Sequence, residues 1–221
     1  MKTGLANIVS KSNLSQELKE ITDYEIGKLS KCESNSIFDS SEISNCPRKL
    51  LYKSVLESKD DLTIDKFNNK FAIKKWAELL RYYVVGTNIP LSDCNYNIVG
   101  NADIVLKINY SKIILKIQSV NDEDFNHILI KGAFKRHVLE LMVNEWLAEI
   151  KDGLIIYENR NDFRFEVFQV YMFAEALESI KNKCRGLVDC KIKGVFPSRP
   201  YKENNAKECD ICNYKTDCWS E

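Results

Sequence analysis

Three cysteines near the carboxyl end of the sequence have a spacing that suits metal chemistry. Cys209, Cys212 and Cys218 form a C-x2-C-x5-C pattern in the segment CDICNYKTDC. Thiolates separated by so few residues can face one centre, which suits a tetrahedral zinc ion or an iron–sulfur cluster. Either centre normally takes four ligands, and the spacing alone leaves both open. Free surface thiols are the competing interpretation, which we disfavour because clustered thiols without a ligand role oxidise readily.

A fourth ligand must come from elsewhere in the chain, which contains eight cysteines. Cys184 lies on the apolar stripe of an expected helix, which favours a core position for its thiol. Cys46 lies in NCPRKLLYK, where an expected helix begins and a thiol is held at a defined point. We therefore expect Cys46 to complete the set, because Cys32, Cys94 and Cys190 have no distinguishing context.

The composition bounds the class of protein. The chain has 221 residues, 44% of them hydrophobic, which is enough for one domain with a core. We expect residues 1–37, which are polar and rich in serine, to be an extension and residues 38–221 to be the domain. The 32 basic and 32 acidic residues cancel, which argues against a protein that coats nucleic acid through net charge.

The chain shows neither a secretory signal nor an apolar run of bilayer length. We therefore expect a protein that is not secreted, has no membrane partner and works in the reducing cytoplasm. If the chain is viral, the corresponding place is the host-cell compartment where the genome is processed.

The spacing of apolar residues predicts helices on both sides of a group of strands. Residues 62–83 have helical periodicity, and residues 95–120, rich in Ile and Val, predict two or more strands. The apolar face expected for the 62–83 helix carries Phe67, Phe71, Trp76 and Leu80.

The second half of the chain repeats this alternation. A long helix is expected over residues 124–150, with an interruption at Gly132, and two strands and a last helix follow it. This order of elements predicts a mixed α/β domain rather than a doubly wound sheet.

Three segments together resemble the iron–sulfur branch of the RecB-like nucleases in the PD-(D/E)xK superfamily. They are SSEISNCPRKLLYK, KGVFPSRP and the terminal C-x2-C-x5-C. The branch includes AddB-type nucleases and the RecB-like exonuclease of CRISPR adaptation, and the resemblance covers about residue 38 to the end. It implies a restriction-endonuclease-like core, with a mixed central sheet flanked by helices and a C-terminal cysteine cluster that closes onto an N-terminal helix. It also implies a [4Fe–4S] cluster on Cys46, Cys209, Cys212 and Cys218, with Zn2+ as the alternative.

The same resemblance predicts a degenerate catalytic motif. The family holds Mg2+ through an Asp on one strand and a Glu-x-Lys on the next. The stretch GNAD matches the first strand and ends at Asp103, but Lys116 and Gln118 stand where Glu and Lys are expected. Because side chains two apart share a strand face, we expect both to look toward Asp103, with Lys116 pairing with it. The helix before these strands offers Trp76 near the place of the family's His.

A second interpretation keeps the enzyme. His137, Glu140 and Asn144 share one helical face, and Glu140 could replace the missing strand carboxylate. Asp103 and Glu140 would then hold Mg2+ or Mn2+ as the catalytic pair. The alternative for His137 and Glu140 is a polar network inside the domain.

The hypothesis that we favour is a catalytically inactive RecB-like nuclease domain that keeps its iron–sulfur cluster. It would serve as a DNA-binding or architectural subunit of a nucleic-acid processing assembly, with DNA and other proteins as partners. A zinc-stabilised protein-interaction module is a third hypothesis. The basic residues that we expect at DNA phosphates are Arg48, Lys49, Lys135 and Arg136.

Overall fold

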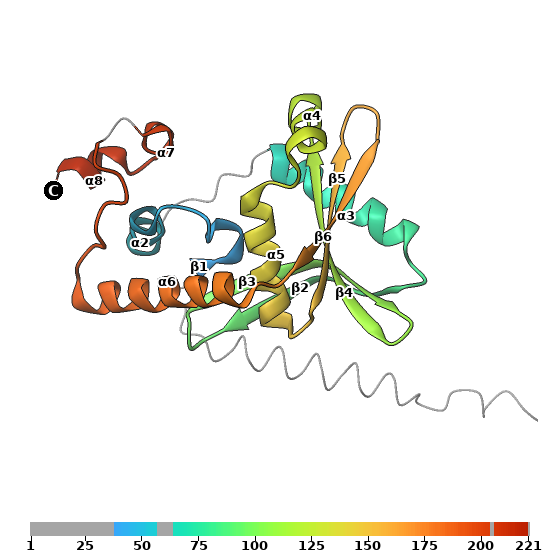
Figure 1. Ribbon diagram of the computed structural model, residues 1–221, viewed down its shortest axis with the longest axis horizontal. Coiled ribbons are helices and arrows are strands. Elements are labelled where there is room, and N and C mark those ends of the chain that lie inside the picture. The colour runs from blue at the N-terminus through green and yellow to red at the C-terminus, as the bar shows by residue number, and fades with distance from the viewer. Residues whose placement is uncertain (1–37, 57–63, 204–205, 221) are drawn as a thin grey trace, which may run out of the picture.

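A mixed sheet forms the centre of the computed structural model, which describes residues 38–56, 64–203 and 206–220. The described residues form a six-stranded sheet in the order β1-β3-β4-β5-β6, with β2 paired to β3 (Figure 1). Its strands are β1 (Phe38–Asp39), β2 (Val84–Asp93), β3 (Ile98–Ile108), β4 (Ser111–Val120), β5 (Asp152–Asn159) and β6 (Phe165–Tyr171).

Helices cover both faces and one end of this sheet. They are a 3-10 turn η1 (Ser40–Glu42), α2 (Pro47–Val55), α3 (Ile64–Leu79), α4 (Asp122–Lys131), α5 (Lys135–Ala148), α6 (Ala174–Lys193), α7 (Lys207–Asp210) and α8 (Lys215–Ser220). The predicted fold class, a mixed α/β domain with a central mixed sheet flanked by helices, is confirmed. None of the helices in the described ranges combines the length and the apolar character needed to cross a lipid bilayer.

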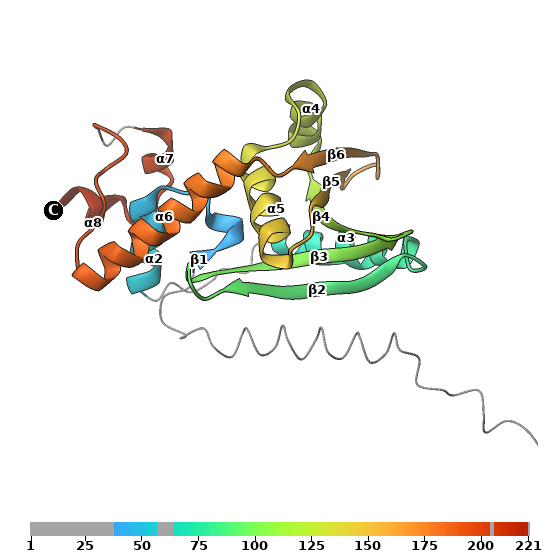
Figure 2. The same ribbon diagram turned by 60° about the horizontal axis from the view of Figure 1, so that its bottom comes forward.

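The two faces of the sheet have separate apolar cores. On one face, α5 packs through Leu141 and Val143 against residues of β3, β4 and β5 (Figure 2). On the other, α3 packs through Ala72 and Ile73 against a smaller cluster. Because side chains alternate along a strand, neighbouring residues of β4 belong to different cores, and Ile114 faces α5 while Leu115 faces α3.

β3 is the strand that joins both halves of the domain. β2 runs along one of its edges, so β1 and β4 must share the other edge. β4 pairs with β3 only from Ile104 onward, and β1 pairs with β3 only at Ile98 and Val99. The stretch between them, which ends at Asp103, therefore has no strand partner on that edge. The sheet is locally interrupted beside these residues.

Most elements expected in the second half of the chain are present. The expected helix over 124–150 is divided into α4 and α5, and Gly132 ends α4 with a φ of 83°, which favours glycine. The thiol of Cys184 is fully buried on α6, as the apolar stripe predicts.

One expectation for the first half was wrong. Phe67 and Phe71 are 71% and 66% exposed, because α3 meets the sheet through Ala72 and Ile73, one position further along. The strand β2 was not predicted, and it includes Pro90 and Asn88, the latter with a φ of 50°. Such residues are typical of turns, and here they lie in an irregular strand.

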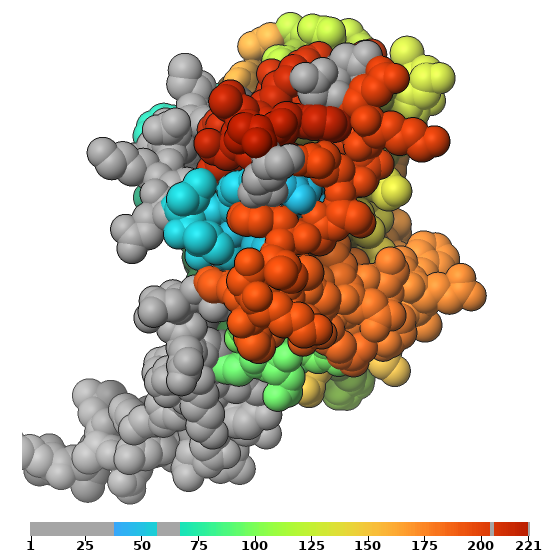
Figure 3. Space-filling model, turned by 90° about the vertical axis from the view of Figure 1, so that its left-hand side faces the viewer, coloured from blue at the N-terminus to red at the C-terminus, as the bar shows by residue number. Residues whose placement is uncertain are grey.

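The cysteine-rich end of the chain returns to its beginning. α6 runs beside α2, and the segment with α7 and α8 lies against α2 (Figure 3). Segments far apart in the sequence are thus neighbours at one end of the molecule. The part of the N-terminal extension prediction that concerns residues 1–37 lies outside the described residues.

Glu145 is a fully buried carboxyl group on α5, where it closely approaches Gly153 of β5. Neither of its oxygens has a hydrogen-bond partner among the described residues. Burial raises its pKa from 4.5 to about 8, and the nearby charge of Asp152 adds to the shift. The folded protein therefore keeps this carboxyl neutral at a pH where the unfolded chain ionises it.

We expect Glu145 to lower the free energy of unfolding as the pH rises. Because its pKa is raised on folding, its contribution is full below about pH 4.5 and is lost between there and about pH 8, at about 1.4 kcal/mol per pH unit. The neutral isostere Glu145→Gln should therefore exceed the wild type in unfolding free energy near pH 8 and match it below pH 4.5. Urea denaturation at several pH values measures this, and parallel pH profiles for the two proteins would contradict it.

Candidate functional site

All four cysteines of the predicted set line one cavity of about 220 Å3 between α2 and the C-terminal segment. Cys46 comes from the start of α2, and Cys209, Cys212 and Cys218 come from the region of α7 and α8. All four are free thiols. Cys190 and Cys184 do not line the cavity, and Cys94 lies at the turn after β2, so the structure brings together the four residues that the sequence singled out.

Local backbone structure sets the positions of these thiols. Cys46 is the N-cap of α2 and precedes Pro47, which suits the first turn because it lacks an N–H. The ammonium of Lys183 on α6 donates to the carbonyls of Ile43 and Asn45, at 2.7 and 2.6 Å, and so holds the loop that leads to Cys46. Lys183 was not predicted as part of this site, and no spacing in the sequence indicates it.

Arg48 joins α2 to the cysteine segment. Its Nε donates to Cys218 Sγ at 3.1 Å, and its Nη1 donates to the carbonyl of Pro197 at 3.0 Å. The side chain is only 6% exposed. It is therefore directed into the protein, a position that does not suit the DNA phosphate contact that we predicted for Arg48.

An aromatic stack supports the same wall. The ring of Tyr52 lies between Phe196, at a centroid distance of 4.2 Å, and Tyr214, at 5.6 Å. Phe196 belongs to the stretch KGVFPSRP, so one role of that stretch is to pack against α2. Arg199 from the same stretch donates two hydrogen bonds to the carbonyl of Cys218. The sequence contained a signal for these residues, since their segment was part of the resemblance, but their contacts required the fold.

The lining of the cavity suits a metal group. Four thiols form the soft donor set that iron–sulfur clusters and zinc take. Burial raises the pKa of Cys209, and the thiols of Cys46, Cys212 and Cys218 raise it further, which shows that all four are electrostatic neighbours. No group of three or more His, Cys, Asp or Glu side chains in the described ranges is arranged around one ion position. The four thiols line the cavity together as a soft donor set that fits a cluster or a zinc ion.

A second group of charged residues lies at the break in the sheet beside β3. Lys116 on β4 is 5% exposed, and its ammonium lies 2.6 Å from Glu140 Oε1 on α5. Asp103 Oδ2 accepts a hydrogen bond of 2.8 Å from the backbone N–H of Ile117. The negative charge of Asp39, at the end of β1, also favours the charged form of Lys116 and raises its pKa. The ammonium therefore has one ion-pair partner, Glu140, and two further carboxylates that act on its charge, Asp103 and, more weakly, the exposed Asp39.

The electrostatics of this group favour a charged lysine. Burial alone lowers the pKa of Lys116, but the charges of Asp103, Glu140 and Asp39 outweigh burial and raise its pKa above the usual value. Burial raises the pKa of Asp103 and Glu140, and the Lys116 ammonium opposes this. The charge of Asp103, which we expected to pair with Lys116, is the largest attraction on that ammonium, while the contact at ion-pair distance is with Glu140. Asp103 also accepts the Ile117 N–H that has no strand partner.

The other degenerate position is directed elsewhere. We expected Gln118 to face Asp103, but its Oε1 accepts a hydrogen bond from Asn69 on α3 at 3.4 Å. β4 no longer pairs with β3 at Gln118, so the Gln118 side chain is directed away from Asp103. Trp76, which we expected near the place of the resembled family's His, donates from Nε1 to the buried carboxylate of Glu158 at 2.8 Å. Neither residue contributes to the charged group around Lys116.

His137 belongs to a polar network inside the domain. Arg136 Nε donates to His137 Nε2 at 3.1 Å, which leaves the proton of the neutral ring on Nδ1, 2.8 Å from Tyr157 Oη. That hydroxyl also accepts the backbone N–H of Phe134 at 3.1 Å. Burial, together with Lys116 and Arg136, lowers the pKa of His137 to about 3, so the ring is neutral. His137 is therefore no proton donor to solvent at neutral pH.

Close packing around Gly100 explains why the GNAD stretch begins with glycine. A Cβ at this position would lie 2.2 Å from Asn144 Oδ1 and 2.9 Å from Ser40 Oγ. Asn144 in turn donates to the carbonyl of Asn101 at 2.9 Å. The backbone of β3 thus passes directly beneath α5, and this close approach places Asp103 near Glu140.

The predicted phosphate contacts other than Arg48 lie in two places. Lys49 lines the cysteine cavity. Lys135 and Arg136 are exposed at the start of α5, and the Arg136 guanidinium lies 5.1 Å from the ring centroid of Phe134. Asp39, which we did not predict, precedes the SSEISNCPRKLLYK segment, and only the pairing of β1 with β3 brings it to Lys116.

Comparisons with known proteins agree with this architecture. No protein-family profile matches the chain, and no curated protein sequence matches it. A crystal structure of SSO0001 is similar to the chain with a TM-score of 0.59 and 16% identity, covering 95% of this chain and 98% of that chain. The alkaline exonuclease LHK-Exo from Laribacter hongkongensis is similar with a TM-score of 0.57 and 6% identity, covering 78% of this chain and 94% of that chain.

A phage-related exonuclease from Haemophilus somnus 129PT is similar with a TM-score of 0.50 and 10% identity, covering 72% of this chain and 96% of that chain. At these identities the likeness establishes the fold alone. The chain is therefore a nuclease-fold protein, and its chemistry must be argued from its own residues.

We expect the Lys116 ammonium to be required for stability. Lys116→Met keeps the length of the side chain but leaves three neighbouring carboxylates without their cation, which should cost about 3 to 5 kcal/mol of unfolding free energy. Lys112→Met, an exposed position on the same strand, is the matched control and should change stability by about 0.5 kcal/mol or less. Urea denaturation at neutral pH measures both, and equal effects of the two changes would show that Lys116 is not the counter-ion.

Proposed function

We propose that this chain is a catalytically inactive nuclease-fold protein that holds a [4Fe–4S] cluster and acts as a DNA-binding or architectural subunit of a nucleic-acid processing assembly. The nuclease fold makes DNA the expected partner. The observation that carries the proposal of inactivity is the buried Lys116 ammonium, which is paired with Glu140 and acted on by the charge of Asp103.

The position of Lys116 opposes metal-dependent hydrolysis. A divalent cation held by Asp103 and Glu140 would have to share their oxygens with an ammonium 2.6 Å from Glu140. The residues of this site therefore do not fit Mg2+ or Mn2+. Gln118 has no acidic or basic function and reaches α3 instead. The alternative of an active nuclease retains one supporting observation, since Asp103 and Glu140 do converge on one position.

The cysteine cavity supports the cluster. Its four thiols would hold the cluster, and Arg48 Nε would donate to one of the sulfur ligands. A single zinc ion, which takes four thiolates at about 2.3 Å, is the alternative that the same donor set supports. When bound, the cluster would join α2 covalently to the C-terminal segment and so close a long loop of chain.

Protein purified without oxygen should contain iron and sulfide and absorb visible light as iron–sulfur proteins do. Cys46→Ser should lose this absorbance and the iron, because it removes the only ligand from α2. Cys190→Ser, a partly buried thiol outside the cavity, is the matched control and should retain both. Metal analysis settles the identity of the group: a colourless wild type with bound zinc would contradict the cluster and favour a zinc-stabilised module.

We expect no cleavage of labelled single-stranded DNA by the wild-type protein with Mg2+ or Mn2+. The reason is that the ammonium of Lys116 takes the place of the metal. Cleavage that is lost in Asp103→Ala and kept in Glu123→Ala, an exposed acidic control on α4, would contradict the proposal and favour the active nuclease.

A double variant tests the same explanation in the other direction. Lys116→Glu with Gln118→Lys restores the residue types that the resembled family uses. We expect Mn2+ to raise the melting temperature of this variant and to leave that of the wild type unchanged. An equal rise in both proteins would mean that the wild type already binds the ion.

A further inference from the structure

Three lysines lie in register at one end of the sheet. Lys107 on β3 and Lys112 on β4 are directly opposite each other in the antiparallel ladder. Ile113 pairs with Asp152, so Lys151, which precedes β5, lies at the level of Lys112 on the next strand. We call these three residues the lysine row. All three are exposed.

The lysine row carries charge that the protein itself does not neutralise. None of the three forms an ion pair with a carboxylate in the part of the chain that the structure describes. Like charges directly opposite on neighbouring strands are destabilising, so the row needs a compensating reason. Glu149 and Asp152 flank Lys151, and the uncompensated charge therefore resides mainly on Lys107 and Lys112.

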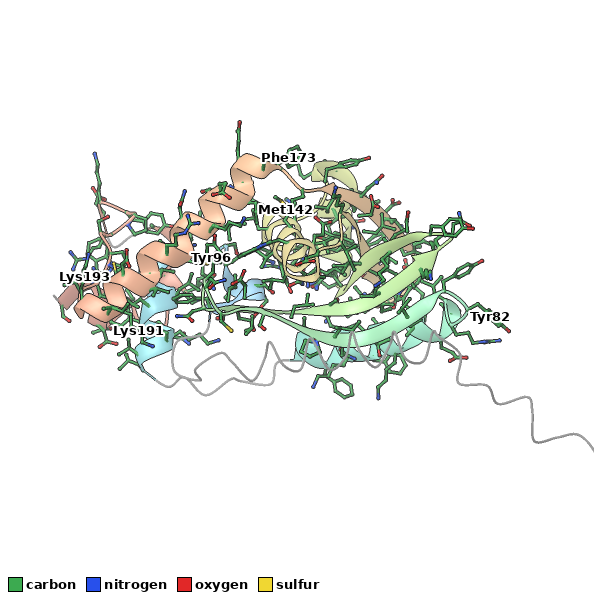
Figure 4. The ribbon with its side chains drawn as sticks, turned by 90° about the horizontal axis from the view of Figure 1, so that it is seen from below. Tyr82, Tyr96, Met142, Phe173, Lys191 and Lys193 are labelled. Atoms are coloured by element: carbon green, nitrogen blue, oxygen red, sulfur yellow. The ribbon has the colours of Figure 1, made fainter. Side chains whose placement is uncertain are left out.

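Exposed aromatic rings adjoin the row. Tyr110 is fully exposed at the turn between β3 and β4, directly after Asn109, whose φ of 55° suits a tight turn. Tyr82 is 83% exposed in the turn before β2 and points away from the body of the protein (Figure 4). The backbone N–H of Lys107 donates to the carbonyl of Tyr83 at 2.7 Å, which holds this second turn beside the hairpin.

The row has a defined orientation relative to the charged group. Val105 and Ile114 belong to the core under α5, and Lys107 and Lys112 lie two residues from them on the same faces of their strands. Lys112 precedes Lys116 by four residues, or roughly 13 Å along a strand. The lysines therefore lie on the α5 side of the sheet, outside the helix, in line with Lys116.

We propose that the lysine row, with Tyr110 and Tyr82, is a binding platform for single-stranded nucleic acid. The ammonium groups of Lys107 and Lys112 contact successive phosphates, and the exposed rings stack on bases. A single strand fits because its bases are free to stack on a side chain, whereas those of a duplex are already stacked. This inference rests on the proposed function, since it locates the nucleic acid on a protein proposed to bind it.

Fluorescence anisotropy of the full-length protein with a labelled oligothymidylate tests the proposal. Lys107→Glu with Lys112→Glu should weaken binding about tenfold or more. The plot of the logarithm of the association constant against the logarithm of the salt concentration should also become shallower, its slope changing by about 1.4, or roughly 0.7 per lost phosphate contact. The matched control is Lys70→Glu with Lys74→Glu, an exposed pair on α3 that covers the opposite face and carries the same change of charge. It should bind almost as the wild type does.

Tyr110→Ala separates stacking from charge. It should weaken the oligothymidylate about fivefold or more and leave a duplex of equal length unaffected. Equal losses for single strand and duplex would overturn the stacking contact, and equal losses in the two lysine pairs would overturn the platform. If the wild type binds while the variants at Lys107, Lys112 and Tyr110 match it, the platform is wrong and the proposed function stands. If the wild type itself does not bind, the DNA-binding function fails as well.

Discussion

The ion pair between Lys116 and Glu140 is the interaction on which the chemistry of this molecule depends. A buried ammonium is stable only with nearby negative charge, and a group of buried carboxylates is stable only with a cation. Each requirement here satisfies the other, since Asp103 and Glu140 come from two elements and act on one lysine, with a weaker attraction from the exposed Asp39. In a fold shared with exonucleases, this arrangement places a cation that belongs to the chain beside carboxylates of the sheet and of α5.

A local break in the sheet makes this convergence possible. β1 and β4 use different parts of the same edge of β3, and the residues between them have no strand partner on that edge. The carboxylate of Asp103 takes one of the backbone N–H groups that this break leaves unpaired. The missing side chain of Gly100 lets α5 come close enough to bring Glu140 to the same point. Backbone geometry, more than any single ligand, therefore defines the site.

The sequence predicted the close grouping of Cys209, Cys212 and Cys218 and most elements of the second half, because both follow from short-range signals, whereas the nearness of Cys46 to the three was expected only from the family resemblance. Thiol spacing, helix periodicity and a glycine that ends a helix are local features. The exposed face of α3 and the strand β2 were missed. An apolar Phe67 suggests a buried position and Pro90 suggests a turn, and only the packing of the folded chain shows that Phe67 is exposed and that Pro90 lies in a strand. Asp39 and Lys183 were missed because their partners lie far along the chain, and nothing in a single sequence indicates such contacts.

The short stretch between Asp39 and Cys46 links the two ends of the domain. Asp39 ends β1 beside the charged group, and Cys46 begins α2 at the sulfur cavity, with only the turn at Ser40–Glu42 and a brief loop between them. Because this connection is short, a displacement of the Cys46 thiol on one side also moves the Asp39 carboxylate on the other. The positions of the sulfur cavity and of the charged group are therefore linked.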